Sequence, residues 1–326
     1  MIKRLPKTFI KKLRVTVPLA VSIIILFVLF RKIDAGQTIE ALRGCDIRLV
    51  ALAVLISMSI NIFFGAVKWR RILVGLGCRL PLREILAIRT GCIPFKVLFP
   101  LKSAELLKAV YLDRRGSLSF TRSIGSLILD KALNLLVLIL IAIVGLTVVD
   151  INIPEAFLVC LLILILLVVY SVLFRQGLIG LASRMHPRLK GVATGLLSGF
   201  AELGFREKMI LVIYSFVYQS SEFFNTFILL KAVGVTVPLF YLMAVIPVIM
   251  VVNNLPITVL GLGTREITIV FFFAGFGPAT SLLSAGILIS LVEHVLPVIT
   301  GILFIRSFHT YFTMKDDVNF VETAEK

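Results

Sequence analysis

Residues 124–149 read IGSLILDKALNLLVLILIAIVGLTVV, and this stretch decides the class of fold. A helix needs about 20 apolar residues to cross the hydrocarbon core of a bilayer, and this run is longer. Every backbone polar group in lipid needs a partner within the chain, so the run is expected to be helical. It therefore predicts a transmembrane helix that carries Asp130 and Lys131 at membrane depth.

Runs of similar character recur along the chain. Hydrophobic residues make up 59% of the sequence, mean hydropathy is +1.05, and 16% of residues are charged, against about 25% in soluble domains. The other runs are Val15–Phe30, Leu49–Val67, Ala156–Phe174, Met209–Leu230, the short Leu239–Val252 and Ser281–Ile305. We predict an all-α polytopic membrane protein with about six to eight transmembrane helices.

The first apolar run follows a basic arm and could be read as a signal peptide. No small-residue cleavage site follows it, because Phe30-Arg31-Lys32 comes next, so we interpret it as a retained span. The four cysteines show no metal-binding or redox spacing. We therefore expect neither a metal nor a cofactor.

The net charge of +16 is unevenly distributed. Basic residues concentrate in the N-terminal arm, in Lys68–Arg89, in Arg114–Arg122 and in Arg175–Lys208, whereas Asp150–Glu155 and Gly275–Thr280 contain none. By the positive-inside rule this predicts a multi-pass protein of the cytoplasmic (inner) membrane with both termini in the cytoplasm. Anionic lipid headgroups fit these surfaces better than nucleic acid, which we do not expect as a partner.

In two stretches the apolar character expected of a transmembrane helix is interrupted by prolines, glycines or charges. Residues 81–113 are interrupted by Pro81, Gly91, Pro94 and Pro100 and carry charges, and residues 239–276 are interrupted around Pro256. Irregular backbone at membrane depth must be buried in protein or line a hydrated cavity. We interpret both stretches as re-entrant, broken-helix hairpins.

The broken stretches occupy corresponding places in two halves with opposite orientation, which is typical of inverted-repeat transporters. We expect an N-terminal arm (1–14), one transmembrane domain (15–307) and a C-terminal tail (308–326). Within the domain, repeat 1 covers about 48–174 with the pair 81–113, and repeat 2 covers about 209–307 with the pair 239–276.

Two segments carry a resemblance to a known family. They are Leu98-Phe99-Pro100-Leu101-Lys102-Ser103-Ala104-Glu105-Leu106-Leu107-Lys108 and Leu255-Pro256-x4-Gly261-Leu262-Gly263-Thr264-Arg265-Glu266. Both resemble signatures of the flippase-like membrane family, which includes the transmembrane region of lysylphosphatidylglycerol synthases. This chain has Ala104 and Lys108 where the first signature usually has Gly and Arg. It also has Asp130-Lys131 and Asn134 where an acid-Arg pair and a later acid are usual.

Charged residues inside the apolar segments are the candidate site, because an unpaired ion in the bilayer costs several kcal/mol. We expect Lys96, Lys102, Lys108 and Arg265 to bind a lipid phosphate. Charge and cavity partners would be Glu105, Glu266, Asp130, Lys131, Asn254 and Glu222. Glu293 and His294 form a candidate proton relay. The alternative is that Asp130–Lys131 and Arg265–Glu266 neutralise one another locally and that the remaining polar residues serve packing.

The resemblance and the charges together predict a flippase. It would move an anionic lipid between leaflets: phosphatidylglycerol, its aminoacyl derivative or a polyprenyl-phosphate carrier. We find no hydrolase, nucleotide-binding or metalloprotease motif, so we do not predict an enzyme. A membrane-embedded lipid transferase and a non-transporting partner of a lipid-modifying enzyme stay open as alternatives. A homodimer is a further alternative.

Overall fold

The computed structural model describes residues 7–98, 105–149, 203–254, 258 and 261–324, and all regular structure in them is helical. Within these residues, three continuous helical stretches are long and apolar enough to cross a membrane: Ile47–Gly75, Phe120–Val148 and Ala279–Phe312. The prediction of an all-α polytopic membrane protein is confirmed. The apolar run Ala156–Phe174 lies outside the described residues.

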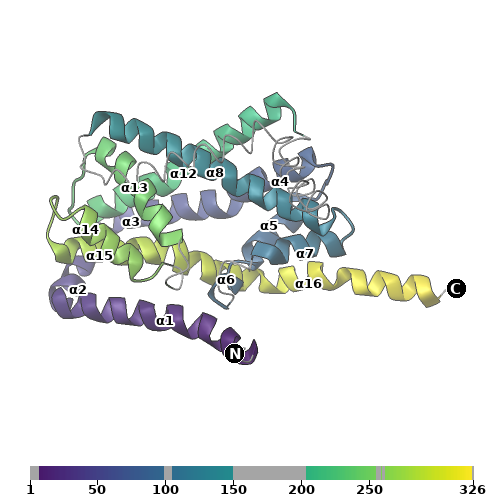
Figure 1. Ribbon diagram of the computed structural model, residues 1–326, viewed down its shortest axis with the longest axis horizontal. Coiled ribbons are helices and arrows are strands. Elements are labelled where there is room, and N and C mark those ends of the chain that lie inside the picture. The colour runs from purple at the N-terminus through teal and green to yellow at the C-terminus, as the bar shows by residue number, and fades with distance from the viewer. Residues whose placement is uncertain (1–6, 99–104, 150–202, 255–257, 259–260, 325–326) are drawn as a thin grey trace, which may run out of the picture.

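The N-terminal half consists of long and short helices (Figure 1). Its elements are α1 (Lys7–Lys32), α2 (Ala35–Arg43), α3 (Ile47–Met58), the π-helical turn η1 (Ser59–Phe64), α4 (Gly65–Gly75), α5 (Leu82–Gly91), α6 (Phe95–Leu98), α7 (Leu106–Arg114) and α8 (Phe120–Val148). The described part of the stretch 81–113 contains α5, α6 and most of α7, and the chain turns at Cys92–Pro94 before α6 begins. Proline disfavours helical geometry in the residue before it, which accounts for this turn.

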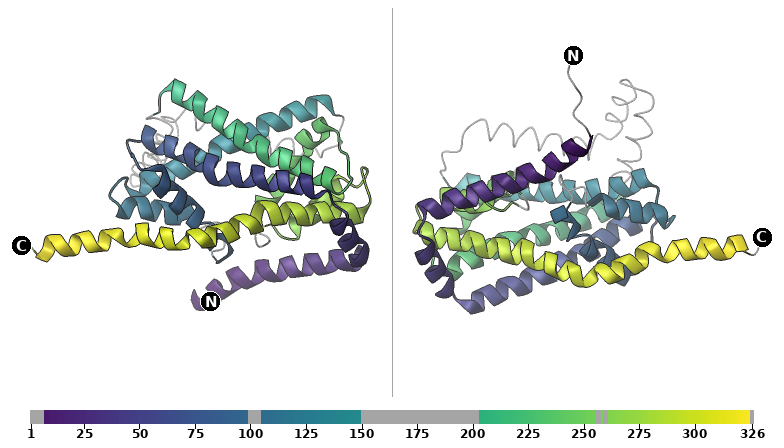
Figure 2. Two further views of the ribbon diagram at one scale, coloured as in Figure 1. Left: turned by 180° about the vertical axis from the view of Figure 1, so that it is seen from behind. Right: turned by 90° about the horizontal axis from the view of Figure 1, so that it is seen from below.

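The C-terminal half has the same arrangement of long and interrupted helices. Its elements are α12 (Phe205–Ala232), α13 (Leu239–Asn254), α14 (Thr264–Phe272), α15 (Ala279–Ser290), the π-helical turn η3 (Leu291–Val295) and α16 (Leu296–Ala324). The three segments α15, η3 and α16 follow one another without a break, and α16 extends well beyond the other helices (Figures 1 and 2). The broken pair expected over 239–276 is present as α13 and α14.

The α3–η1–α4 segment and α12 lie antiparallel along their whole lengths. The backbone of Asp46 donates to Ala232 at one end, the rings of Phe64 and Tyr214 stack near the middle, and Arg71 pairs with Glu207 at the other end. As the residue number rises in one segment, it falls by about the same amount in the other. The two segments therefore run in opposite directions.

The same turn follows the α3–η1–α4 segment in the first half and α12 in the second. Gly77-Cys78-Arg79-Leu80-Pro81-Leu82 in the first half corresponds to Gly234-Val235-Thr236-Val237-Pro238-Leu239 in the second. Both glycines have positive φ (83° and 81°), which glycine adopts readily because it lacks a Cβ. The amides of Cys78 and Val235 bond back to Leu73 and Leu230, and those of Ile85 and Leu242 bond to the two prolines.

The spacing between these turns is 157 residues, and it identifies a pair of equivalent residues in contact. Tyr218 donates a hydrogen bond of 2.7 Å to Asn61 Oδ1, and these two residues are also 157 apart. A residue can contact its own equivalent in the other half only close to the two-fold axis that relates the two halves. Since the helices that carry them are antiparallel, the halves form an inverted repeat around the Asn61–Tyr218 contact.

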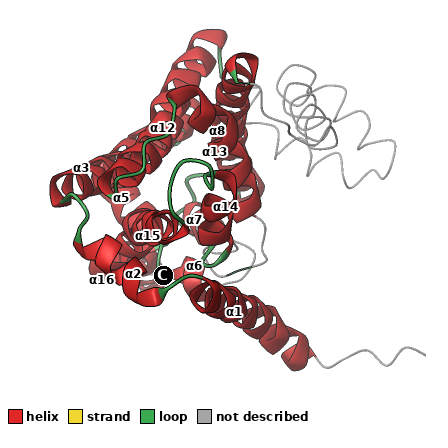
Figure 3. Cartoon of the chain, turned by 90° about the vertical axis from the view of Figure 1, so that its left-hand side faces the viewer, coloured by secondary structure: helices red, strands yellow, loops and turns green. Residues whose placement is uncertain are grey.

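Helix packing has the symmetry of the repeat: a contact between two helices recurs between their equivalents in the other half. Helix α5 packs on α16 as α13 packs on α8, and α7 packs on α8 as α14 packs on α15. The first two of these pairings depend on a glycine in the long helix: Gly301 of α16 against α5, and Gly145 of α8 against α13. Seen along the long axis of the molecule, α1 lies at the side of the bundle (Figure 3).

The described residues form two large apolar cores, and both halves contribute to each. The first lies among α4, α5, α7, α8 and the far part of α16, and the second among α3, α12, α13, α14 and α15. Phe308 of α16 is buried in the first core, and Tyr311 and Phe312 pack against it. Helix α16 therefore still packs on this core at the residues where the C-terminal tail is expected to begin.

Candidate functional site

Three lysines gather around one carboxylate in the first half. Glu105, at the start of α7, contacts Lys108 at 2.6 Å, Lys96 of α6 at 3.1 Å and Lys131 of α8 at 3.8 Å. Short helices joined by a break can bring charges from three elements to one point, which a single straight helix cannot. We call these four residues the lysine cluster.

The lysine cluster carries more positive than negative charge. Glu105 is 16% exposed and Lys108 is 8% exposed, whereas Lys131 is largely open. A single carboxylate cannot neutralise three ammonium groups, and separating these charges from water raises their affinity for an anion. The cluster therefore has the charge and partial exposure of an anion-binding site. The Lys108 ammonium also lies 5.7 Å from the Trp69 ring, and this is the sole tryptophan of the chain.

Lys68 and Asp130 form a second ion pair beside the lysine cluster. Lys68 Nζ is 2.9 Å from Asp130 Oδ1 and also donates to Asn134 Oδ1, and the lysine side chain is only 1% exposed. Lys68 begins a basic segment that the sequence predicts to be cytoplasmic, but the structure places it inside α4, in a stretch of spanning length. Asp130 pairs with Lys68 and Lys131 with Glu105, so these sequence neighbours do not neutralise each other as the alternative had it.

Glu266 holds the start of α14 in place. Its Oε2 accepts the Gly263 amide at 2.6 Å and its Oε1 accepts the Ser290 hydroxyl at 2.5 Å. Gly263 has φ +91°, and Gly286 of α15 approaches so closely that a Cβ there would lie 3.1 Å from Glu266 Cα. The carboxylate therefore satisfies a helix N-terminus and locks α14 against α15.

Because Glu266 is 1% exposed and accepts two hydrogen bonds, its replacement has a predictable cost. Glutamine has one acceptor oxygen, so Glu266→Gln loses one of the two bonds. We expect a loss of stability of about 1–2 kcal/mol, measured as a lower melting temperature of the purified protein. Glu40→Gln on the exposed face of α2 is the control and should leave the melting temperature unchanged. Equal melting temperatures for the two variants would contradict this role.

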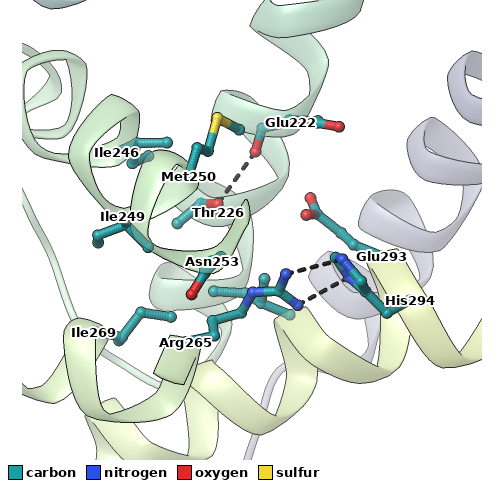
Figure 4. Close-up of a pocket in the computed structure, with 11 residues that line it drawn as sticks. Glu222, Thr226, Ile246, Ile249, Met250, Asn253, Arg265, Ile269, Glu293 and His294 are labelled. Atoms are coloured by element: carbon teal, nitrogen blue, oxygen red, sulfur yellow. Dashed lines mark hydrogen bonds between the residues drawn. The ribbon is translucent and has the colours of Figure 1, made fainter. Parts of the chain in front are cut away.

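Arg265 points away from Glu266, toward α15 and η3. Its Nη1 and Nη2 lie 2.9 Å and 3.0 Å from the His294 ring nitrogens, and Nη1 donates to Ser290 at 3.3 Å. A cavity of about 140 Å³ opens beside it, with room for several water molecules. Figure 4 shows Arg265, His294, Glu293 and Glu222 around this space, which we call the arginine pocket.

Buried polar atoms face the arginine pocket. Glu293 Oε1 and Asn253 Oδ1 are both buried and make no hydrogen bond within the described residues. Asn225 of α12, 1% exposed, hydrogen-bonds to the Glu293 carboxyl group. The π-helical turn η3 widens the helix at Glu293 and His294, and such turns frequently occur at functional sites.

The expected site residues thus fall into two groups. Lys96, Lys108, Glu105 and Lys131 come together in the first half, with Asp130 beside them; Arg265, Glu222, Glu293 and His294 come together in the second. Figure 1 shows α7 and α14 toward opposite ends of the molecule. Lys102 and the side chain of Asn254 lie outside the described residues. Within those residues, no group of three or more His, Cys, Asp or Glu could hold a metal ion.

Lys68 does not appear among the site residues expected from sequence, because the apolar run Leu49–Val67 stops one residue before it. The signal that could have placed it is the repeated Gly-x3-Pro-Leu turn, which marks the true end of the helix beyond Lys68. The contact between Arg265 and His294 had no such signal, because a helical break and a π-helical turn bring the two residues together.

The fold and its two polar sites define a polytopic membrane protein built as an inverted repeat, with charged groups inside its helical bundle. The chain belongs to the family of the lysylphosphatidylglycerol synthase transmembrane region, whose family model matches residues 15–301. Among curated proteins, none matches the chain. Membership of this family indicates a lipid-related function in a membrane.

Proposed function

We propose that the protein moves a lipid with an anionic headgroup between the two leaflets of the cytoplasmic membrane. The observation that carries this proposal is the lysine cluster, in which three ammonium groups share one carboxylate. A phosphate group matches such a site because its oxygens can accept charge-assisted hydrogen bonds from several lysines at once. Phosphatidylglycerol, its aminoacyl derivative and a polyprenyl phosphate all carry this group.

The inverted repeat supports transport rather than binding alone. Two equivalent halves of opposite orientation can exchange conformations, which opens a site near their interface to one side and then to the other. The lysine cluster and the arginine pocket lie toward opposite ends of the molecule, so a headgroup could pass from one to the other. The acyl or isoprenoid tail would stay in the surrounding lipid.

The arrangement of basic residues supports cytoplasmic termini. Arg71 at the end of α4 pairs with Glu207 at the start of α12, and α5 and the α7–α8 turn lie at the same end (Figure 1). This end carries Arg79, Arg83, Arg114, Arg115 and Arg122, as expected for a cytoplasmic face. We also propose repeat boundaries at about 48–174 and 209–307.

Lipid binding can be tested directly through Trp69. We expect its fluorescence to change when phosphatidylglycerol or a short polyprenyl phosphate is added to the purified protein, because the ring lies beside Lys108. Lys108→Gln and Lys131→Gln each remove one charged partner of the phosphate. Each should weaken binding by about tenfold, equivalent to ~1.4 kcal/mol.

Transport is measured in proteoliposomes with a fluorescent lipid whose outer-leaflet fraction can be bleached. Lys108→Gln should slow the exchange between leaflets, whereas Lys231→Gln, an exposed lysine at the end of α12, should not. Wild-type rates no faster than those of empty vesicles would contradict the proposal. A new lipid product formed from lipid and donor would instead indicate a transferase. Binding without movement would favour a non-transporting partner of a lipid-modifying enzyme.

A further inference from the structure

The inverted repeat allows the two polar sites to be compared position by position. Lys68 of α4 and Asn225 of α12 are equivalent, since they have the same 157-residue separation as Asn61 and Tyr218. Both side chains are 1% exposed. Each contacts an acidic side chain on the last long helical stretch of its half, which is α8 in the first half and α15–η3–α16 in the second. Lys68 contacts Asp130 of α8, and Asn225 contacts Glu293 of η3.

The contacts made by these two equivalent residues differ in charge. In the first half the acid is neutralised by a buried lysine at 2.9 Å. In the second half an uncharged asparagine occupies the lysine position, so Glu293 has no ammonium group at that place. Its Oε1 is buried without a hydrogen bond in the described structure and faces a cavity with room for water. The acid of the second half therefore lacks the counter-ion that a buried lysine supplies in the first half.

The surroundings of Glu293 make the arginine pocket acidic when both of its carboxyl groups are ionised. The charged or titratable groups around Glu293 are Glu222 of α12, Arg265 of α14 and the neighbouring His294 of η3. The uncharged polar groups there are Asn253 of α13 and Ser290 of α15. Arg265 can neutralise only one of the two carboxylates, Glu222 and Glu293. A phosphate that reached this end would be repelled unless a carboxylate took up a proton.

We propose that Glu293 binds a proton that crosses the membrane together with the anionic headgroup, so that the protein is a proton–lipid symporter. The proton converts the Glu293 carboxylate into a neutral carboxyl group, which lets the phosphate approach Arg265, and it is released when the headgroup leaves. His294 is not the carrier, because its ring already touches the Arg265 guanidinium and a proton there would place two cations in contact. This inference rests on the proposed transport function.

The test uses proteoliposomes that contain a fluorescent phosphatidylglycerol and a trapped pH-sensitive dye. At equal pH on both sides the wild-type protein should equilibrate the lipid. A gradient of one pH unit, acidic outside, should move lipid inward and shift the ratio between leaflets by up to about tenfold, since one pH unit is a tenfold ratio of protons. Symport gives the same direction for either orientation of the protein in the vesicle.

Two variants examine Glu293 by independent changes. Glu293→Gln removes the titratable group, and Asn225→Lys restores the lysine found in the first half, which should keep Glu293 ionised. Both should abolish the gradient-dependent shift and the accompanying dye signal. Glu40→Gln, the same chemical change on an exposed helix, should respond like the wild type. Lipid-dependent Trp69 fluorescence shows that each variant is folded, because this ring lies in the other half.

The outcomes separate the two proposals. Wild-type exchange that ignores the pH gradient would overturn proton coupling and leave transport intact. A folded Glu293→Gln variant that still follows the gradient would overturn the assignment of the proton to Glu293. Absence of any wild-type exchange would overturn the transport function, and proton coupling would fall with it.

Discussion

Replacing Lys68 with methionine is expected to destabilise the protein by about 3–5 kcal/mol, the usual cost of leaving a buried charge without its partner. Lys68 is a buried residue of α4. Its ammonium group lies 2.9 Å from Asp130 of α8 and donates to Asn134, which is also on α8. Methionine fills a similar volume but leaves the Asp130 carboxylate uncompensated. The loss should appear as a large drop in melting temperature, measured on detergent-purified protein.

The double variant Lys68→Met/Asp130→Asn tests the reason for this loss. It removes both charges and should recover much of the stability, because the penalty arises from the unpaired carboxylate rather than from lost packing. The control is Lys231→Met, which changes an exposed lysine on α12. If Lys68→Met were as stable as this control, the buried ion pair would not stabilise the contact between α4 and α8.

Adding one methyl group at Gly145 is expected to separate α8 from α13. A Cβ at this position would lie 2.3 Å from the backbone nitrogen of Ala244 and 2.6 Å from the carbonyl carbon of Met243. Backbone atoms cannot turn aside as a flexible side chain can, so the helices must move apart. We expect Gly145→Ala to cost at least about 1–3 kcal/mol, measured by thermal unfolding.

The repeat supplies a second site for the same experiment. At Gly301 of α16 a Cβ would lie 2.5 Å from Pro94 Cδ and 2.8 Å from the carbonyl oxygen of Thr90, so Gly301→Ala should have a similar effect on the contact with α5. Gly275→Ala is the matched control, because no atom lies within 4 Å of its Cβ position. Similar stability for Gly145→Ala and Gly275→Ala would show that the bundle can adjust, contrary to this prediction.

Much of the architecture followed from local sequence. The length of the apolar runs and the demands of backbone hydrogen bonding in lipid predicted the helices. The prolines and glycines predicted that 81–113 and 239–276 would be interrupted. The repeat itself had a local signal, the Gly-x3-Pro-Leu turn at Gly77 and Gly234, because a helix end with positive φ depends on nearby residues alone.

The partners of the charged residues did not follow from sequence. Asp130 and Lys131 are neighbours in the chain, yet on a helix they point in different directions and contact Lys68 and Glu105. Arg265 and Glu266 separate in the same way, one toward His294 and the other toward Gly263 and Ser290. Neutralisation at membrane depth depends on which helices pack together, and that is a property of the whole fold.

The sequence by itself thus determined that this chain is a membrane protein of interrupted helices with charges among them, because hydropathy and helix breaks act over a few turns of chain. Only the tertiary structure decided that these charges form a lysine cluster in one half and an arginine pocket in the other. It also decided that Glu293 faces Asn225 where Asp130 faces Lys68. The physical reason is that a buried charge is governed by the atoms around it, and most of these come from helices distant in sequence.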